Sequence, residues 1–483
     1  MDAEAAYLFR HALLRDAAYQ LQPPGDRAKL HELAFYLIEQ AFGGRAPDAP
    51  SLDAEDGTEQ PPHPTDPVSF ELAEHAQLAL AEHPDPGGTL HALCTLYLRR
   101  AAECATRLFQ AEAGASAWQR LAKLLPPQQR GEAIRRAAIL LVQGGNARSA
   151  ESLFRQAVEC AASTGNKQAA GLALGNLGSV RRQTGRLQEA EQAFEQALAV
   201  ARETGDQRGE GTALANLAIV FQATGRSDLA EGACLKALDI SREIGNRRVE
   251  GVVLGNLAGI YQQSGRLEQA QQMHTQALAI HREFGNRRFE GLALGNLATI
   301  QLQRGESELA EQTLEHALAI HREVGDRRNE GGVLGNLAVL YRQRGQIDLA
   351  VLTSEQAVAL SRDVGDLINE GIALGNLAIA LQHAGRIDSA LRTSEQAMAI
   401  HRKTGNRRFE GLNLCNHARL LVAAGAHDEA RSAWKAGARI LTQLNDSSSL
   451  AQKTEAMREA CVQAGVTPFE NSEDEEAPQT RPD

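Results

Sequence analysis

Aromatic side chains are scarce in this sequence, at 4% of its 483 residues. That scarcity leaves too few rings for a surface on which nucleic-acid bases stack. The net charge of −11 and the isoelectric point of about 5.8 also argue against a general binder of polyanions, although a local basic strip is compatible with them. Nucleic acid is therefore not an expected partner.

The six cysteines are scattered without a CxxC pair. This spacing excludes a disulfide framework and favours a reduced compartment. No apolar run approaches the ~20 residues needed to cross a bilayer, and residues 1–16 lack the uncharged apolar stretch of a signal peptide. These absences predict a cytoplasmic protein with no membrane partner.

Signatures of catalysis and cofactor binding are missing as well. The GxxxxGK[ST] loop that cradles nucleotide phosphates does not occur, and no Ser–His–Asp set, carboxylate pair or metal spacing rises above chance. His11 and His31 have no Cys or carboxylate partners at ligand spacing, so we interpret them as packed or surface residues. We expect no enzymatic activity, no cofactor, no metal and no small-molecule substrate.

The sequence does contain a forty-residue repeat, clearest in residues 246–285. Leu254 and Leu257 belong to the apolar face of a first helix, Gly265 interrupts the pattern, and a second apolar stripe follows. Gly285 closes the unit, since glycine accepts the left-handed conformation past a helix end, and the next residue can cap the following helix. The unit thus predicts a helical hairpin.

The hairpin recurs without slippage, because neighbouring closing glycines are 40 residues apart (205 − 165). The closing glycines, each followed by Asn or Asp, are Gly165, Gly205, Gly245, Gly285, Gly325, Gly365 and Gly405. A small residue recurs at one phase of the second helix, where we expect the two helices to cross closely: Ala150, Ala190, Ala230, Ala270, Ala310, Ala350, Ala390 and Ala430. So strict a period predicts a solenoid of stacked hairpins.

Residues 256–280 resemble the tetratricopeptide repeat, at Leu257, Ala258, Tyr261, Gly265, Ala270, His274 and Ala277; His274 departs from the family's aromatic. With forty residues in place of ~34, each helix should be roughly 16–18 residues long. The forty-residue form is similar to Pins-type spindle-orientation adaptors and, more loosely, to kinesin light chain. The resemblance, over about residues 90–445, implies an all-α, right-handed superhelical solenoid that binds a protein or peptide partner.

Composition marks the other segments of the chain. Residues 1–43 are predicted to be helical, with Asp26 as an N-cap after the Pro23–Pro24–Gly25 break, and residues 44–66 to be a flexible, disordered linker that loops out. We expect divergent opening helices and a first hairpin in residues 67–130, tandem repeats in 131–445, a capping helix in 446–465, and an acidic disordered tail in 466–483.

A second resemblance lies near the start of the chain. About 35 residues resemble the segment that follows the ATPase module of STAND-type signalling ATPases, a winged-helix end before helical repeats in proteins fused to cyclase or kinase domains. The matching residues are Phe9, Arg10, His11, Ala12, Arg15, Asp16, Tyr19 and His31. Because the phosphate loop is missing, the resemblance implies an alternative function: the sensor or regulatory arm of such a protein, with its catalytic part outside this chain.

One recurring feature is not explained by packing: an asparagine inside each first helix of the in-phase repeats, directly after a small residue, at Asn176, Asn216, Asn256, Asn296, Asn336, Asn376 and Asn416. Asn there is up to about 0.7 kcal/mol less favourable than Ala, but its amide offers a peptide backbone a donor and an acceptor. In the families it resembles, asparagine at this position contacts the peptide main chain. We predict a row of asparagines that holds an extended peptide. The alternatives are amides that bond between adjacent repeats and simple copying by duplication.

Positions a turn or two further on vary, and we expect them to set specificity: Arg182, Arg342, Gln183, Gln263, Gln303 and Gln343. This mostly neutral lining with two positive charges favours an acidic or amide-rich peptide.

Arginine pairs open four units, at Arg247–Arg248, Arg287–Arg288, Arg327–Arg328 and Arg407–Arg408. A glutamate lies three residues after the first arginine of each pair, so we interpret these residues as solvated ion pairs. The alternative is an anionic ligand along that edge. His281, His321 and His401 are interpreted as surface residues near helix ends.

Overall fold

The computed structural model describes residues 21–52, 60–82, 88–108, 110–444 and 446–469, and this part of the chain is helical, without strands. The chain forms two compact units, Met1–Ala213 and Leu214–Asp483. No helix in the described ranges is long and apolar enough to cross a membrane.

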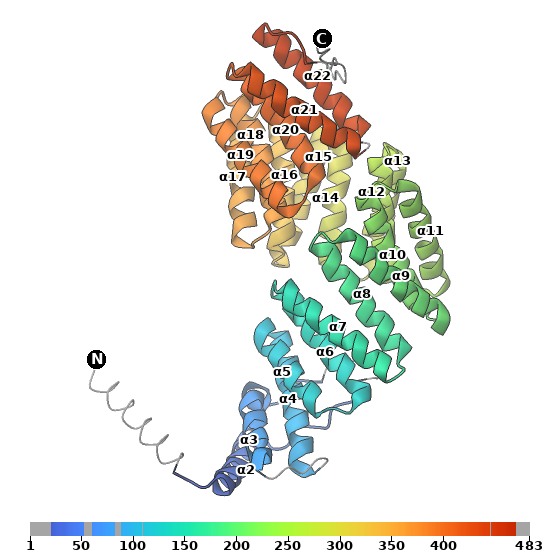
Figure 1. Cartoon of the computed structure of the whole chain (residues 1–483), viewed down its shortest axis with the longest axis vertical. Coiled ribbons are helices and arrows are strands. Elements are labelled where there is room, and N and C mark those ends of the chain that lie inside the picture. Colours follow the sequence, from blue (N-terminus) through green and yellow to red (C-terminus); the bar gives the residue numbers. More distant parts are fainter. Residues whose placement is uncertain (1–20, 53–59, 83–87, 109, 445, 470–483) are drawn as a thin grey trace, which may run out of the picture. The chain divides into compact units, whose positions relative to one another are not determined.

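Unit 1 holds the opening helices and the first repeats (Figure 1). Its elements are α2 (Pro24–Ala41), η1 (Asp66–Val68), α3 (Ser69–Glu82), α4 (Thr89–Arg107), α5 (Ala111–Leu124), α6 (Pro127–Gln143), α7 (Ala147–Ser163), α8 (Lys167–Gln183) and α9 (Leu187–Thr204), and α10 (Gln207–Ala223) crosses the unit boundary.

Unit 2 continues the same succession of hairpins and ends with one more helix. Its elements are α11 (Ser227–Glu243), α12 (Arg247–Gln263), α13 (Leu267–Glu283), α14 (Arg287–Gln303), α15 (Ser307–Glu323), α16 (Arg327–Gln343), α17 (Ile347–Asp363), α18 (Leu367–His383), α19 (Ile387–Thr404), α20 (Arg407–Ala423), α21 (His427–Gln443) and α22 (Ser447–Ala464). In the gap-free range 110–444, the sixteen helices α6 to α21 pair as eight hairpins, in register with the forty-residue period.

Glycine and N-cap residues set the helix ends, as the sequence predicts. Gly265 and Gly285 have φ of 75° and 61°, in the left-handed region that only glycine adopts without strain. At most junctions between repeats a side chain caps the next helix; Asn246 Oδ1, for example, accepts from the backbone N–H of Val249. Asn286 makes no such hydrogen bond in the described structure, so the predicted cap after Gly285 is wrong. The turn inside the hairpin has no such cap at Arg266. Side-chain caps are therefore more frequent at the junctions between repeats than at the turns within hairpins, of which the α6–α7 turn, capped by Asn146, is an exception.

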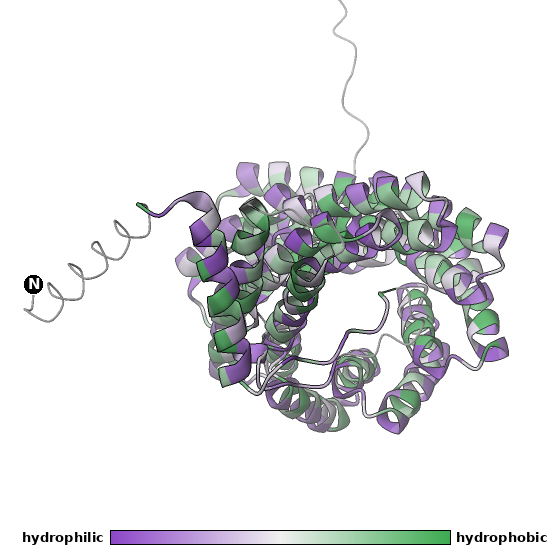
Figure 2. Cartoon of the chain, turned by 90° about the horizontal axis from the view of Figure 1, so that it is seen from below, coloured by the Kyte–Doolittle hydropathy of each residue, from purple (hydrophilic) through white to green (hydrophobic). Residues whose placement is uncertain are grey.

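Each hairpin is closed by the recurring alanine on its second helix. All eight of these alanines are fully buried. Successive apolar faces then merge into continuous cores: one cluster in unit 2 runs from Leu278 to Leu420. Figure 2 shows apolar and polar residues alternating along the helices, because each helix buries only one face.

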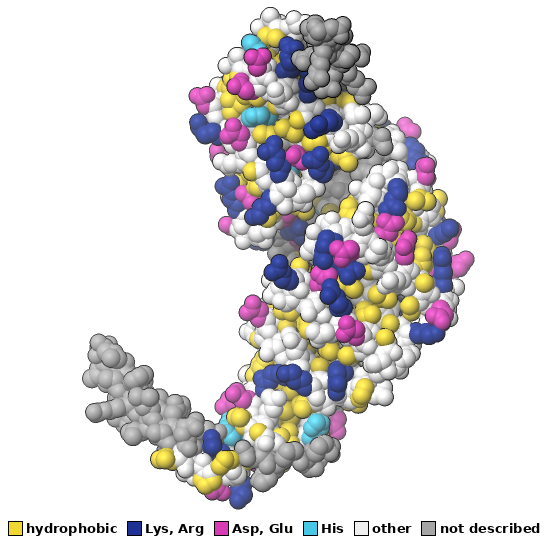
Figure 3. All heavy atoms as spheres, viewed as in Figure 1, with side chains coloured by type: hydrophobic (Ala, Val, Ile, Leu, Met, Phe, Trp, Pro, Cys, Tyr) yellow, Lys and Arg dark blue, Asp and Glu magenta, His cyan; other side chains and the backbone are white. Residues whose placement is uncertain are grey.

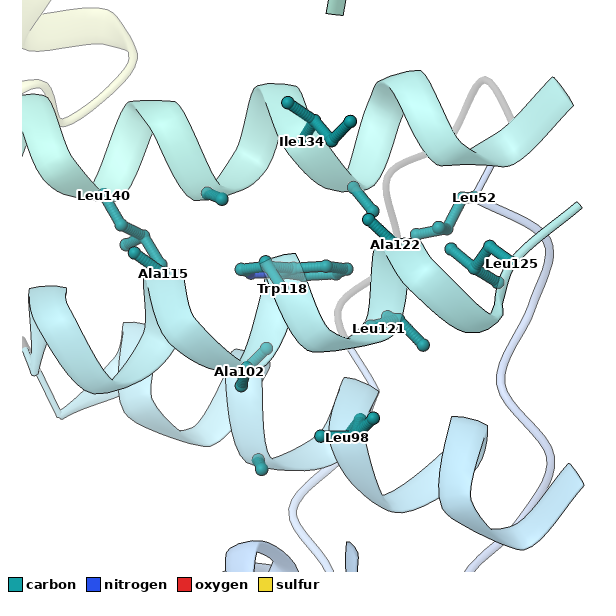
Figure 4. Close-up of a cluster of buried hydrophobic side chains, with 14 of the residues drawn as sticks. Leu52, Leu98, Ala102, Ala115, Trp118, Leu121, Ala122, Leu125, Ile134 and Leu140 are labelled. Carbon is teal, nitrogen blue, oxygen red and sulfur yellow. The ribbon is translucent and has the colours of Figure 1, made fainter. Parts of the chain in front are cut away.

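The described ends of the predicted linker, residues 44–52 and 60–66, do not loop out. Leu52 is buried and lies beside Leu125 and Ala122 (Figure 4). Asp66 accepts hydrogen bonds from the guanidiniums of Arg100, at 2.8 Å, and Arg107, at 2.6 Å. The prediction of a flexible linker is wrong for these parts, because Arg100 and Arg107 of α4 hydrogen-bond to Asp66 and so hold the segment against the helix. Residues 53–59 lie outside the described ranges.

The start of the described chain differs from the prediction, whereas its last helix agrees with it. Pro23, not Asp26, precedes the first residue of α2, and Asp26 lies in its first turn. Helix α22 covers the last hairpin as predicted, with Met457 and Cys461 buried against α20 and α21. His11 and the predicted helix before residue 21 lie outside the described residues, as does most of the acidic tail. The Nδ1 atoms of His31 and His75 lie 2.8 Å apart.

Candidate peptide-binding face

The first helices of successive repeats pack on one another in unit 2. Helix α12 contacts α14, α14 contacts α16, α16 contacts α18, and α18 contacts α20, in addition to the partner of each helix in its own hairpin (Figure 1). Successive second helices lie farther apart. Within this unit the stack therefore curves toward its first helices, which form its concave side.

The predicted asparagines lie on these first helices and are all half-buried. Within the unbroken range 110–444, six of the seven make no side-chain hydrogen bond, and the Nδ2 atom of Asn256 is buried without a partner. Asn416 differs, because its Oδ1 accepts a hydrogen bond from Nζ of Lys453 at 2.8 Å. Apart from that one contact with α22, the amides are not engaged between adjacent repeats. We call the surface formed by Asn216, Asn256, Asn296, Asn336, Asn376 and Asn416 in unit 2 the asparagine face; Asn176 holds the equivalent position in unit 1.

The surroundings of the small residue before each asparagine differ from repeat to repeat. A Cβ atom added to Gly255 would meet nothing within 4 Å, so the space there is open. A Cβ atom on Gly375 would lie 2.6 Å from Oδ1 of Asn413, which belongs to the next first helix. Close approach of successive helices explains glycine at 375, whereas at 255 nothing within the chain requires it.

Aliphatic side chains flank the asparagines along the same helix face. On α14, Leu292 lies four residues before Asn296 and is 40% exposed. On α16, Val339 lies three residues after Asn336 and is half-buried. Half-buried aliphatic residues fill the equivalent positions elsewhere in unit 2: Ile219, Val252, Ile372, Ile379 and Leu412. The asparagine face thus alternates between amides and apolar contact surface.

The positions predicted to set specificity lie at the C-terminal ends of the same helices. Gln183, Gln263, Gln303 and Gln343 are exposed, whereas Arg182 and Arg342 are half-buried. One glutamine pair spans two repeats, with Nε2 of Gln262 donating to Oε1 of Gln303 at 3.3 Å. Burial lowers the pKa of both Arg182 and Arg342, and Nε of Arg182 is buried without a hydrogen-bond partner.

The arginine pairs at repeat starts are occupied by carboxylates. Three first arginines contact the glutamate three residues on, for example Arg287 to Glu290 at 2.7 Å; Arg327 instead pairs with Asp363 at 3.3 Å. Three second arginines, Arg288, Arg328 and Arg408, reach the N-cap aspartate of the next repeat, as Arg288 reaches Asp326 at 2.8 Å; within the described residues no such pair forms at Arg248, where the next N-cap is Asn286. The face in Figure 3 shows the resulting mixture of basic and acidic side chains. Several of these ion pairs connect neighbouring repeats, which supports the ion-pair interpretation over an edge that binds an anionic ligand.

The prediction that His281, His321 and His401 are surface residues is wrong. Their exposed fractions are 4%, 1% and 0%, because each ring fills the space left by a glycine on the first helix of its own hairpin. A Cβ atom on Gly371 would lie 2.6 Å from Cε1 of His401. Burial lowers the pKa of all three imidazoles. The recurrence of glycine at 251, 291 and 371 was the available sequence signal.

Comparison with known proteins identifies the repeat. The family model of the tetratricopeptide repeat matches residues 129–203, 209–283, 289–363 and 369–443, which together make up more than half of the chain. No curated protein matches this chain.

Solved structures with the same fold include a Rap protein complexed with Competence and Sporulation Factor, at 13% identity over 80% of this chain and 99% of that one, with a TM-score of 0.52. The apo form of the quorum sensor NprR from B. thuringiensis gives 15% identity over 68% and 92%, with a TM-score of 0.50. A STAND protein with a tetratricopeptide repeat sensor from Pyrococcus horikoshii gives 18% identity and a TM-score of 0.45; the match covers 70% of this chain but about half, 53%, of that one.

Proposed function

Because the chain belongs to the tetratricopeptide-repeat family, we propose that it is a protein-interaction scaffold that binds an extended peptide segment of a partner along the asparagine face. The observation that carries the proposal is the row of asparagines on the concave side of unit 2, of which all but Asn416 make no side-chain hydrogen bond in the described structure. The buried Nδ2 atom of Asn256 is unfavourable without a partner. The other amides keep polar atoms open to solvent, and the main chain of an extended peptide can offer all of them donors and acceptors.

The aliphatic neighbours complete the proposed recognition mode. Alternate side chains of an extended peptide point to opposite sides, so every second one can contact residues such as Leu292 or Val339 while the backbone meets the amides. The amides supply affinity for any extended segment, and the varied positions at the helix ends, Arg342 and the exposed glutamines among them, select its sequence.

A triple variant, Asn256→Ala, Asn296→Ala and Asn336→Ala, tests the proposal. Peptides selected on the wild-type chain from a displayed random library should bind the variant ~100-fold more weakly, since each lost hydrogen bond contributes about 1 kcal/mol. Replacing backbone N–H groups of the selected peptides by N-methyl groups should weaken binding to the wild type similarly. Fluorescence polarisation measures both effects.

The matched control is Gln272→Ala, Gln312→Ala and Gln356→Ala, which removes three exposed amides from second helices instead. It should keep wild-type affinity, and circular dichroism should show the same helix content in all three proteins. Unchanged affinity in the asparagine variant would refute the peptide-binding role of the asparagine face.

The regulatory arm of a STAND-type protein is the second candidate, supported by the resemblance around residues 9–31. A scaffold and a sensor arm can use the same asparagine face, so the two differ in what the chain is joined to. A neighbouring reading frame that encodes a phosphate loop, and an ATPase whose activity changes when this chain is added, would favour the arm.

A further inference from the structure

Four basic residues gather at the C-terminal end of the asparagine face. Arg342 is on α16, His383 ends α18, Arg419 is on α20 and Lys453 is on α22. These helices pack successively, α16 on α18, α18 on α20 and α20 on α22 (Figure 1). The Lys453 ammonium hydrogen-bonds Asn416, the last asparagine of the row. The four residues, which we call the basic cluster, therefore adjoin the proposed peptide path.

The positive charge of the basic cluster is not balanced by the protein. Arg342, Arg419 and Lys453 are half-buried, yet none forms an ion pair in the described residues, and Nε of Arg419 is buried without a hydrogen-bond partner. One carboxylate, that of Glu459, is close enough to influence Arg419. Burial and the guanidiniums of Arg419 and Arg342 lower the pKa of Lys453 to about 8. Burial and the same two guanidiniums also lower the pKa of His383.

Packing does not require a cation at residue 419 or 453, because other repeats hold apolar side chains at the same phase of the period. Val339 and Ile379 are equivalent to Arg419, and Val333 and Ala373 to Lys453, although Asn413 also shares the phase of Lys453. The positions equivalent to Arg342 are mixed, with Leu302, Gln382 and Arg182 among them. Placing three half-buried like charges together is unfavourable without a counter-ion. Seven of the eight arginines at repeat starts, all but Arg248, in contrast have carboxylate partners in the described structure.

We propose that the basic cluster binds a phosphate group. Two guanidiniums and an ammonium carry three positive charges against the single nearby carboxylate, an excess of two that a phosphate dianion matches and a carboxylate does not. A guanidinium also presents parallel N–H donors that pair with two phosphate oxygens. The inference rests on the proposed function for its source: a phosphorylated side chain of the peptide held by the asparagine face. A free phosphate compound would present the same chemistry.

Three probes separate these sources: inorganic phosphate, a peptide selected on the asparagine face that carries one phosphoserine, and the same peptide with serine. We expect the phosphopeptide to bind at least ~10-fold more tightly than the serine peptide, as measured by calorimetry. Binding of inorganic phosphate without a preference for the phosphopeptide would support the phosphate site and overturn its peptide source. Equal affinities for the two peptides and no binding of phosphate would overturn the proposal.

Variants copied from other repeats keep the test independent of folding. Arg419→Ile and Lys453→Val each introduce a residue that the same position holds elsewhere in the chain. Each should abolish the preference for the phosphopeptide, retain affinity for the serine peptide, and raise the melting temperature, since like charges are removed. Arg439→Leu, which removes an exposed arginine of α21, is the control and should keep the preference. The asparagine triple variant should lose both peptides but keep inorganic phosphate, so the two proposals can fail separately.

Discussion

At the scale of single residues, histidine shows how one side chain takes different roles in a repeat. His274 stands where other repeats hold Phe194, Leu314 or Trp434, and it is 1% exposed. It fills the aromatic position of the second helix as an uncharged ring. Burial lowers its pKa to about 4, so the folded chain excludes a proton that the unfolded chain binds.

His274 therefore predicts a loss of stability in acid. Between the ordinary histidine pKa of about 6.5 and the folded value of about 4, the unfolded state holds more protons, so the free energy of unfolding falls as the pH falls. At pH ~5 the loss from this residue should be about 2 kcal/mol relative to pH ~8. Urea unfolding at the two pH values measures it.

Two variants test whether His274 causes this pH dependence, one at His274 itself and one at an exposed histidine. His274→Leu, copied from Leu314, should reduce the pH dependence, whereas His316→Gln, at an exposed site on α15, should not. The buried His281, His321 and His401 will leave a remainder. Identical pH dependence in wild type and His274→Leu would contradict the assignment.

Residue patterns along the chain could predict the backbone but not every side-chain environment. The glycine and N-cap positions gave the helix ends, and the recurring alanines gave the close crossings, because these depend on local conformation and period. The histidines were misplaced because polarity suggested a surface position, while their burial depends on a glycine thirty residues earlier in the sequence, such as Gly371 for His401. Nor does the sequence show that Lys453 reaches Asn416.

At the scale of elements, the α18–α19 hairpin illustrates how a first helix makes room for a side chain of its partner. We expect Gly371→Ala to destabilise this hairpin by ~1–3 kcal/mol, because the new Cβ atom would lie 2.6 Å from the buried ring of His401. Hydrogen exchange of α18 and α19, together with the urea midpoint, measures the loss. A second change, His401→Ser, should restore part of it, since Ser361 lies opposite Gly331 in the preceding hairpin.

Gly255→Ala is the matched control for Gly371→Ala. A Cβ atom at 255 meets nothing within 4 Å, so alanine should stabilise α12 by about 0.5–1 kcal/mol relative to glycine. Equal effects of the two substitutions would show that the fit between glycine and histidine does not matter. Because residue 255 precedes Asn256, peptide binding by the same variant also reports whether the open space beside the asparagine is used.

At the scale of the whole molecule, a solenoid is stabilised by contacts between neighbouring repeats, so its ends need covers. In unit 1 the opening helices and residues 44–52 cover the first hairpins, with Leu52 beside Leu125 (Figure 4). Sequence reasoning could not find this, since a segment rich in Pro, Asp and Glu shows no period. Its contacts are with residues far away in the sequence, as when the backbone N–H of Ala46 donates to the hydroxyl of Tyr97 on α4.

The cover of unit 2 is α22, and its removal tests how local the stabilisation is. A chain ending at Leu444 loses Met457 and Cys461, which pack with Cys415 and Trp434. We expect faster hydrogen exchange in α20 and α21 with little change in α12 to α15, because repeats contact only their neighbours. The control chain ends at Phe469 and keeps every described element. Uniform loosening of all repeats would instead mean that unit 2 unfolds as one cooperative body.

The shorter chain also lacks Lys453, so it should lose phosphate binding while keeping peptide contacts at Asn256 and Asn296. Loss of both ligands together would mean that the asparagine face depends on α22.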